Sequence, residues 1–594
     1  MEKNELLKGG EFLVKETKAE DVFIPEEFNE EQLMIEDTCY DFLKQDVYPN
    51  FEKIDKHEKG LIKGLLGKAG ELGLLGISVP EEYGGFEQSF LTSMKAGEAM
   101  GSAHSFSVAY MCHVGIGTLP ILYYGNEEQK NKYIPELAAG EKAAAYCLTE
   151  PDAGSDANAG RSKAVLSEDG KHYILNGQKM WITNGGFADV YTVFAKIDDD
   201  RILSAFIVER EWEGLEVSVE ENKMGIKGSS TTQVFFNDVK VPVENLLGKR
   251  GEGFRIAINI LHIGRIKLGA TVIGSMKRTI NHSVQYSNER KQFGNLISNY
   301  GAIKFKLAEQ VIKVWTHESA LYRASADVER LIDMYVADGM DKGKAVIQAN
   351  ADYQVECAML KVLGSESLDY IVDEGVQIFG GMGFSAEAPV DRAYRDSRIN
   401  RIFEGTNEIN RIWAGDNAIK KGMKGADGLK KNMAEVMESL TNLPEMPEYA
   451  EGYYAYYKEV ISRFKKGIHL VMGAANAKYS RKLSNEQEII FNIADMMIEV
   501  YAAESTALRI EKLEGMKGAD AVKLYKDILD VYTYDIASNI RKYAKDAIFS
   551  FVEGEEITNY MKGVKYFTCV KGVNVKDARR RLADKLIDDN QYNY

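Results

Sequence analysis

The sequence predicts an α+β fold that is mainly helical, with a small β-domain inserted between helical layers. Residues 27–140 and the chain from 251 onward carry apolar side chains near helical spacing. Residues 144–247 hold short runs rich in β-branched and aromatic residues, separated by turn residues. A chain of 594 residues is too long for one compact core. We therefore expect an N-terminal helical domain (1–143), a β-barrel-like domain (144–250), a helical bundle (251–422) and a C-terminal helical extension (423–594).

The first two domains carry different periodic patterns. A long apolar helix is expected through Met111 and Leu119, with Pro120 ending or kinking it. In the β-domain, Asn176-Gly177 lies between the runs YIL and QKMWIT and predicts a hairpin. Further strands are expected over 189–197, 202–210 and 232–241.

Helical periodicity returns in the bundle and the extension. Helices are predicted over 253–285, from about 300, over 343–364 and over 366–379. Two prolines in LTNLPEMPEY, residues 440–449, indicate a linker. Residues 484–487 read SNEQ, a capping-box pattern that predicts the start of an apolar helix.

Composition excludes several classes of function. A formal net charge of −16 disfavours a general nucleic-acid binder, which needs a basic surface. The five cysteines form no CxxC pair and are expected to be reduced thiols in a cytoplasmic protein. The eight histidines form no ligand cluster, so no catalytic metal is expected. The start, MEKNELLKGGEF, shows no leader pattern, and no run approaches the roughly 18 apolar residues that span a bilayer.

The stretch YRDSRINRIFEGTNEINR, residues 394–411, carries the strongest chemical signal. Glu404 follows Ile402 and Phe403 and precedes a Gly-Thr-Asn turn. Apolar neighbours disfavour the charged form of a carboxylate, and a carboxylate with a raised pKa can act as a base near neutral pH. Thr406 and Asn407 suit the start of the following helix. The alternative is a solvated glutamate that interacts with the helix dipole.

Two stretches of the β-domain suit a phosphate-bearing planar ligand. In YCLTEPDAGSD, Gly154 and Ser155 can bring backbone N–H groups and a hydroxyl to a phosphate, although a plain surface turn reads the same way. In KMWITNGG, Trp181 and Thr183 alternate along a strand and can flank a heteroaromatic ring. A core tryptophan under a hairpin is the alternative.

Two further stretches belong to the bundle. NERKQFG offers the cations Arg290 and Lys291 to a phosphate and Phe293 to a ring, although solvated charges at a helix end are the usual alternative. VQIFGGMGF allows close backbone approach at Gly380 and Gly381. GxGxxG and Walker patterns are both missing from the sequence, which disfavours a nicotinamide or nucleoside-triphosphate site.

These five stretches, together with KMGIKGSSTTQVFF, resemble the acyl-CoA dehydrogenase family over about residues 27–422 in their order along the chain. The motifs are YCLTEPDAGSD, MWITNGG, KMGIKGSSTTQVFF, ERKQFG, QIFGGMGF and YRDSRINRIFEGTNEI. The resemblance implies FAD between the β-domain and the helical bundle, with its far end reaching the neighbouring subunit of a homodimer. The extension is similar to that of the very-long-chain branch, which also contacts membranes. A stripe from Tyr457 to Met472 beside basic residues fits such contact, and a packed helix is the alternative.

The resemblance also assigns site residues. The FAD contacts on the β-domain are Tyr146, Cys147, Leu148, Thr149, Gly154, Ser155, Trp181, Ile182 and Thr183. Those expected to reach the partner's FAD are Arg290, Lys291, Gln292, Gln377, Ile378, Phe379, Gly380 and Gly381, and Phe293 is a further cofactor contact. The contacts to the adenosine half of FAD are Thr406, Asn407 and Glu408. Acyl-CoA is expected to touch Ser155, Arg265 and Gly405, with Glu404 as the catalytic base.

The implied reaction is α,β-dehydrogenation of a fatty acyl-CoA, of long chain, to trans-2-enoyl-CoA in β-oxidation. Glu404 removes the α-proton, the β-carbon gives a hydride to FAD, and an electron-transferring flavoprotein takes the electrons. Small residues in CHVGIG (Cys112, Gly115, Gly117) fit a deep acyl channel. An acyl-CoA oxidase that uses O2, or a non-catalytic flavoprotein assembly factor on the same fold, are the alternatives.

Three positions depart from the family pattern. Many relatives have aspartate where His262 stands and glutamine where Gly301 stands, so one CoA contact and one nucleotide contact are expected to be missing. Some branches carry the base at the position of Gly264, which has no side chain. Glu404 is therefore the one base that the resemblance offers.

Overall fold

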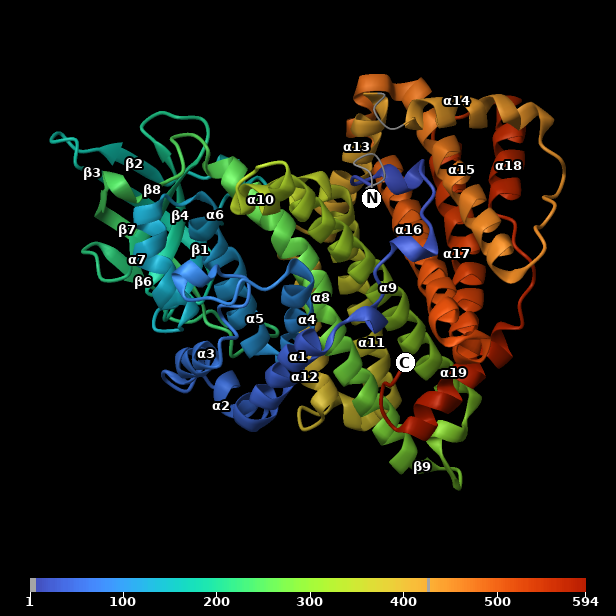
Figure 1. Cartoon of the computed structure of the whole chain (residues 1–594), viewed down its shortest axis with the longest axis horizontal. Coiled ribbons are helices and arrows are strands. Elements are labelled where there is room, and N and C mark those ends of the chain that lie inside the picture. The colour runs from blue at the N-terminus through green and yellow to red at the C-terminus, as the bar shows by residue number, and fades with distance from the viewer. Residues whose placement is uncertain (1–6, 425–427) are drawn as a thin grey trace.

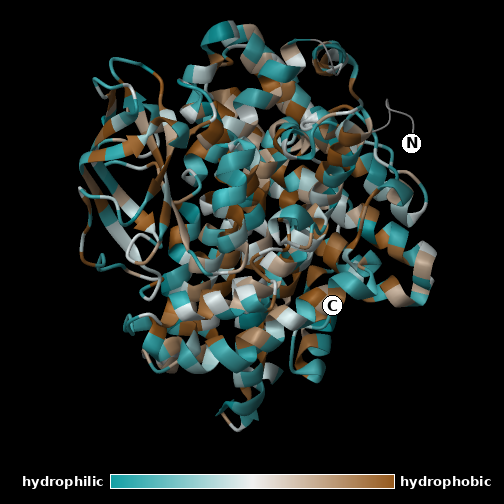
Figure 2. Cartoon of the chain, turned by 60° about the vertical axis from the view of Figure 1, so that its left-hand side comes forward, coloured by the Kyte–Doolittle hydropathy of each residue, from teal (hydrophilic) through white to brown (hydrophobic). Residues whose placement is uncertain are grey.

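The computed structural model describes residues 7–424 and 428–594, which form three helical regions and a β-domain, with the β-domain at one end and the C-terminal helices at the other (Figure 1). Residues 1–6 and 425–427 lie outside this description. The first six belong to the stretch that is expected to hold no leader. Hydrophobic residues gather on the inner faces of helices and strands, whereas the outer loops of the β-domain are mostly hydrophilic (Figure 2). The mainly helical α+β class predicted from the sequence is confirmed.

The N-terminal helical region packs around its own apolar core, which includes Phe42, Leu65 and Phe106. Asn29 and Ser89 cap two of its helices with their side-chain oxygens. The long helix expected through Met111 is interrupted, and Pro120 lies in the first turn of the next helix, where proline loses no hydrogen bond. The helices are α1 (Glu30–Phe42), α2 (Phe51–Asp55), α3 (Leu61–Glu71), α4 (Phe90–Met100), α5 (Ser105–Cys112), α6 (Leu119–Tyr124) and α7 (Glu127–Ala138).

The β-domain is one eight-stranded sheet with the order β6-β7-β3-β2-β4-β5-β8, and β1 pairs with β4. The predicted hairpin at Asn176-Gly177 is wrong, because β3 runs straight through it with a bulge at this point. A Cβ on Gly177 would lie 2.3 Å from Ser162 Oγ, so the glycine allows close strand packing and not a turn. The strands are β1 (Ala144–Cys147), β2 (Lys163–Leu166), β3 (His172–Thr183), β4 (Val190–Ile197), β5 (Ser204–Glu209), β6 (Leu215–Val217), β7 (Thr231–Pro242) and β8 (Leu246–Leu247).

The bundle is built on three long helices that pack side by side in the middle of the molecule: α8, α9 and α11 (Figure 1). The break predicted near residue 365 is wrong. The break lies at Tyr353 instead, between α10 and α11, and α11 runs on through Gly364, which packs against the ring of His317. The elements are α8 (Gly253–Glu289), β9 (Lys291–Gln292), β10 (Asn295–Leu296), α9 (Gly301–Ala337), α10 (Lys342–Asp352), α11 (Gln354–Phe379), α12 (Pro389–Ser397) and α13 (Asn407–Met423).

The extension adds six helices against α9 and α13. The predicted capping box is wrong, because Ser484 donates its hydroxyl to Asp416 and Glu486 precedes the helix without a side-chain cap. The apolar stripe of α15, including Ile461, Phe464 and Ile468, is buried within the chain, as the packed-helix alternative expects. The helices are α14 (Leu429–Ser439), α15 (Tyr453–Tyr479), α16 (Gln487–Lys517), α17 (Lys523–Phe549), α18 (Glu556–Phe567) and α19 (Val575–Asp589).

Two helical stretches contradict the expectation that no run is apolar enough to cross a bilayer. Among the described residues, Ser105–Tyr124 and Gly253–Glu289 are long and apolar enough by length and composition. Most of each stretch is buried inside the fold, where α8 forms part of the central core. Burial of this kind is typical of core helices.

The N-terminal strap, residues 7–28, crosses the bundle and lies against the extension (Figure 1). The ring of Phe12 contacts that of Tyr501 at 4.9 Å. Arg509 of α16 pairs with Glu26 of the strap and with Glu318 of α9, both at 2.8 Å. The strap therefore joins the two ends of the chain through buried charges.

Glu318 lies at the centre of this charge network. It accepts from Lys277 of α8 at 2.6 Å as well as from Arg509. Burial alone would raise the pKa of Glu318, but Lys277 and Arg509 lower it to about 2. The charged form is thus favoured in the fold, and its stabilising effect is present above the unfolded value near 4.5 and is lost as the pH falls toward 2.

Replacing Glu318 by glutamine is expected to destabilise the protein by about 3 kcal/mol, because it leaves two buried cations with one partner fewer. The midpoint of thermal unfolding at pH 7 measures this loss. Glu16→Gln is the matched control, since Glu16 forms an exposed pair with Lys458 that is worth less than about 1 kcal/mol. Equal midpoints for the two variants would show that the network contributes nothing to stability.

Candidate active site

A deep cavity lies between the N-terminal helices, α8 and the segment that precedes α13. One face of α8 lines it from Gly264 to His282, at the three- and four-residue spacing of a single helix face. Met111, Cys112 and Ile116 line the opposite wall, and Thr183 reaches it from the end of β3. The volume of the cavity is about 130 Å³. Glu404 lines this cavity, as the sequence predicts for a base.

The carboxylate of Glu404 lies directly against Gly264. A Cβ at residue 264 would come within 2.7 Å of Glu404 Oε2, so only glycine leaves room for this carboxylate. Oε2 is shielded from solvent and has no hydrogen-bond partner among the described residues. Burial raises the pKa of Glu404 to about 7, against the lowering effect of Arg265 and Lys361. The group is therefore poised to take up a proton near neutral pH.

Side chains that donate hydrogen bonds to backbone carbonyls hold the loop that carries this carboxylate. Glu404 and Gly405 adopt φ values of 56° and 78°, and the left-handed region is costly for a glutamate. Asn410 Nδ2 donates to the carbonyls of Glu404 and Gly405 at 3.3 and 2.8 Å. Lys361 Nζ donates to the Gly405 carbonyl at 2.9 Å, and Arg265 Nε donates to the Glu404 carbonyl at 3.3 Å. These donors fix the strained conformation.

Lys361 and Asn410 were missed by the sequence analysis. Lys361 is the lone charge within the apolar run CAMLKVLG, and that isolation is the signal that points to a buried role. Asn410 lies in the first turn of α13, where a buried asparagine can reach back to the preceding loop. Both act on the loop backbone and leave the cavity free.

Arg265 and the start of α13 lie behind the loop. Arg265 is 2% exposed, contacts the ring of Trp413 at 5.4 Å and is not among the residues that line the cavity. Thr406 caps α13, as predicted. Asn407 is buried and bonds to Lys361 and Ser365, whereas Glu408 is exposed. The side chain of Asn407 is thus engaged inside the protein.

Alternation along β1 and β3 decides which predicted residues of the β-domain can reach a ligand. Tyr146 faces the helical core, and its hydroxyl is buried without a partner. Cys147 and Ile182 point into the core of the β-domain, so their side chains cannot contact a cofactor. Leu148 faces the same helical core as Tyr146. Thr149 is half-buried and accepts from the backbone N–H of Met180 at 2.9 Å.

Trp181 interrupts the alternation of β3. The pairing of β3 with β7 shifts register between Lys179 and Ile182, and Trp181 adopts φ 60°. Its indole is 53% exposed although it begins beside the buried core of the sheet. Strain of this kind at a bulky residue marks functional sites. An exposed indole two residues before Thr183, which lines the cavity, fits the face of a planar ring, and the exposed Gly154 and Ser155 lie on the loop that follows β1.

The stretches around Arg290 and Gly380 form a second, separate groove. Tyr286 stacks on Phe379 at 4.0 Å and joins the end of α8 to the end of α11. The groove is lined by Arg290, Gln292, Phe293, Ile378, Phe379, Gly380 and Gly381, whereas Lys291 and Gln377 are exposed beside it. It shares no lining residue with the Glu404 cavity.

The rim of this second groove is unusually apolar for a solvent-facing surface. Phe293 and Phe384 are 93% and 92% exposed within one chain. At Gly301, where many relatives are expected to carry glutamine, Arg580 of α19 lies 3.3 Å from the place of a Cβ. The extension therefore covers the position at which the nucleotide contact is missing.

A Gly264→Ala variant is expected to fold and to displace the carboxylate of Glu404, because the added Cβ meets the flexible end of that side chain. A crystal structure of the variant should show Glu404 in a different rotamer. Gly515→Ala, in an exposed turn of α16 with open space around it, is the control and should add up to about 1 kcal/mol of stability. An unmoved Glu404 in Gly264→Ala would refute the steric argument.

Comparison with known proteins places this architecture in one family. Profiles described as the acyl-CoA dehydrogenase N-terminal, middle and C-terminal domains match residues 29–141, 145–239 and 251–419, and a further C-terminal-domain profile matches 463–566. A probable acyl-CoA dehydrogenase of Bacillus subtilis (strain 168) is 43% identical over 586 residues, which is 98% of both chains.

Two other comparisons agree. The mitochondrial very long-chain specific acyl-CoA dehydrogenase of Rattus norvegicus is 43% identical over 60% of this chain and 52% of its own length. A crystal structure of an acyl-CoA dehydrogenase complexed with FAD from Bacillus anthracis covers 99% of this chain and 100% of its own, with a TM-score of 0.96 and 44% identity. The chain belongs to the acyl-CoA dehydrogenase family.

Proposed function

We propose that this protein catalyses FAD-dependent α,β-dehydrogenation of long-chain fatty acyl-CoA to trans-2-enoyl-CoA. The observation that carries the proposal is the shielded carboxylate of Glu404, which lacks a hydrogen-bond partner at the wall of a largely apolar cavity. A carboxylate in this setting is available to take a proton from a ligand in the cavity. Membership of the family supports both the reaction and the cofactor.

The residues present fit FAD on structural grounds. The strained, exposed indole of Trp181 lies two residues before Thr183, which lines the cavity, and the buried hydroxyl of Tyr146 has no hydrogen-bond partner among the described residues. Thr149, Gly154 and Ser155 would hold the flavin and pyrophosphate through hydroxyl and backbone donors. When bound, FAD supplies a two-electron acceptor for hydride. Cys147 and Ile182 would contribute backbone atoms only.

Glu404 would remove the α-proton of the thioester in its ionised form. The missing side chain at Gly264 leaves space for the acyl chain and the carboxylate to meet. The backbone N–H of Glu404 would donate to the thioester carbonyl, and a donor of this kind supplies roughly 3 kcal/mol of transition-state stabilisation. Ile399 and Phe403 help exclude water from the same cavity wall.

The depth of the cavity supports a long acyl chain. Gly115 and Cys112 line it, whereas Gly117 packs against Ala144 and serves close packing. Electrons would pass to an electron-transferring flavoprotein, and peroxide production in air would instead favour the oxidase alternative. The five cysteines are free thiols, which supports a reducing compartment such as the cytoplasm, to be checked by cell fractionation.

The second groove supports a homodimer. Arg290, Phe293 and the Gly380–Gly381 backbone would reach the FAD of the partner subunit, whose surface would cover the exposed phenylalanines. Light scattering of the purified protein checks this, and a monomer that retains FAD would refute it.

Replacing Glu404 by glutamine is expected to leave FAD bound but to slow its bleaching by hexadecanoyl-CoA by about 10²- to 10⁴-fold, the usual contribution of a general base. Anaerobic flavin absorbance measures the rate. Glu356→Gln is the matched control, because burial also raises the pKa of Glu356 to about 7 although this residue bonds to Gly10 and lies outside the cavity. Normal bleaching by the Glu404 variant would overturn the assignment.

The rate of flavin reduction is expected to rise as the pH increases through about 7, because only ionised Glu404 accepts a proton. Burial lowers the pKa of Lys361 to about 7 as well, so the midpoint belongs to both groups. In Lys361→Met the loss of a cation should move the midpoint upward. Stopped-flow rates between pH 5 and pH 9 test this, and a midpoint near the ordinary value of 4.5 in either protein would contradict it.

A further inference from the structure

The Glu404 cavity runs on to a second polar end that dehydrogenation of a simple acyl chain does not use. Nine residues on one face of α8 line it, from Gly264 beside the Glu404 carboxylate to Arg278 and His282. Fourteen residues of helix separate Gly264 from Arg278, a distance of about 21 Å at 1.5 Å per residue. Between these ends the wall is largely apolar, with Leu268, Val272, Met111, Leu368 and Val372.

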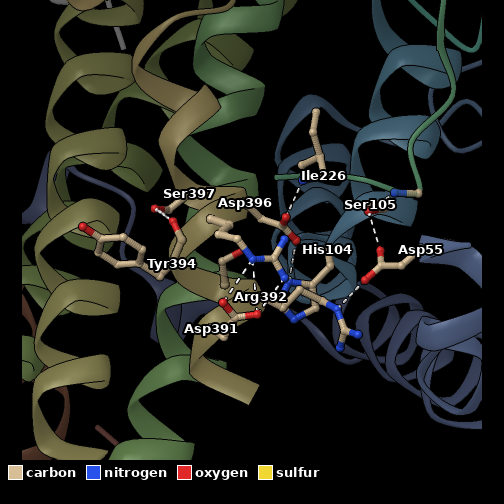
Figure 3. A network of polar contacts seen from close by, with 12 residues as sticks. Asp55, His104, Ser105, Ile226, Asp391, Arg392, Tyr394, Asp396 and Ser397 are labelled. Carbon is tan, nitrogen blue, oxygen red and sulfur yellow. Dashed lines mark hydrogen bonds and ion pairs between the residues drawn. The ribbon is translucent and has the colours of Figure 1, made fainter. Parts of the chain in front are cut away.

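Two guanidinium groups and one imidazole surround the ring of Phe51 at this far end. The Arg278 and Arg392 guanidinium carbons lie 5.3 and 5.4 Å from the ring centre, and the His104 ring lies 5.1 Å away. Two of them have carboxylate partners (Figure 3): Arg392 pairs with Asp55 at 2.8 Å, and His104 contacts Asp396 at 3.1 Å.

Arg278 has no such partner. Its guanidinium lies over the ring of Tyr48 at 4.0 Å and hydrogen-bonds to the Tyr48 side chain, and among the described residues no carboxylate pairs with it. Its Nε is shielded from solvent and has no hydrogen-bond partner. A guanidinium without a carboxylate partner is costly on the wall of a mostly apolar cavity.

The neighbouring groups leave Arg278 available to a ligand. Both oxygens of Asp396 are engaged, one by His104 and the other by the backbone N–H of Ile226 (Figure 3). His282 lines the cavity one turn beyond Arg278, and its Nε2 is also buried without a partner. Burial lowers the pKa of His282 to about 4, with further lowering by Arg278 and His104, so the ring is neutral and can donate one hydrogen bond.

We propose that Arg278 and His282 form a binding site for the terminal carboxylate of an α,ω-dicarboxylic acyl-CoA, whose thioester end lies at Glu404. A carboxylate matches the planar guanidinium fork and also accepts from the imidazole. The proposal rests on the proposed dehydrogenation, because it uses the same cavity and places the α-carbon at the same base.

Geometry sets the length of the acyl chain. An extended chain advances roughly 1.2 Å per bond, as the span of an extended polypeptide shows. The side chain of Arg278 leans toward the N-terminal end of α8 and shortens the gap. The gap of about 21 Å, given by the helix rise, is therefore spanned by a diacid of about 14 to 18 carbons that reaches from Glu404 to Arg278.

The test compares two substrates of equal length, hexadecanoyl-CoA and the mono-CoA thioester of hexadecanedioic acid. The FAD-loaded protein is mixed with each under anaerobic conditions, and the ratio of kcat/KM for diacid over monoacid is measured. The wild-type ratio is expected to be one or higher. In Arg278→Met the ratio should fall by about tenfold to a hundredfold, the usual effect of losing a hydrogen-bonded charge partner.

Three comparisons make the result specific. Arg278→Lys keeps the charge without the fork and should give an intermediate ratio. The exposed Arg201→Met is the control and should keep the wild-type ratio. Octanedioyl-CoA is too short to reach residue 278, so Arg278→Met should change its rate by less than about twofold. Flavin content and the unfolding midpoint show whether each variant is folded. If Arg278→Met does not fold, the ratio measured for Arg278→Lys replaces it as the test.

A wild-type ratio below about one tenth would overturn the proposal. So would an equal loss of kcat/KM for hexadecanoyl-CoA and for the hexadecanedioic thioester in Arg278→Met. These outcomes differ from failure of the proposed function. If hexadecanoyl-CoA bleaches the flavin and the diacid thioester does not, only the terminal-carboxylate site is refuted. If neither thioester bleaches it, the dehydrogenase proposal itself is refuted.

Discussion

The arrangement of the whole site depends on one contact, the carboxylate of Glu404 against the bare backbone of Gly264. This contact is possible because α8 presents no side chain at residue 264 and because the loop after Phe403 turns sharply enough to aim the carboxylate at it. The turn is costly for a glutamate, and Asn410, Lys361 and Arg265 stabilise it through the loop carbonyls. The surrounding burial then shifts the pKa to about 7.

The β-domain and the helices contribute different surfaces to the rest of the site. The β-domain presents Trp181 and Thr183 at the end of a long strand, where a bulge releases one side chain from the alternation that buries its neighbours. The helices supply an apolar cavity with wall residues spaced along a single face of α8. Sheet and helices thus contribute different surfaces, one polar and exposed and the other enclosed and apolar, and Glu404 lies where they meet.

Much of this could be predicted from the sequence because the signals are local. The spacing of apolar residues predicted α8 and α9, and turn residues marked the limits of the strands. The apolar neighbours of Glu404 indicated its burial. The errors arose where a local signal has two meanings. Gly177 permits close packing and not a hairpin, Gly364 packs on His317 inside a helix, and Ser484 bonds to Asp416 of another helix. Lys361 was missed because its partners, the Gly405 carbonyl and the Asn407 side chain, lie more than forty residues away in sequence.

The N-terminal strap has a consequence for how the chain is assembled. Its contacts with Tyr501 and Arg509 of α16 join residues that lie about 480 positions apart in the sequence. During synthesis the strap leaves the ribosome long before α16, so the surface that receives it does not yet exist. The strap must therefore wait until α16 has been made, and a nascent chain cannot complete this part of its core before then.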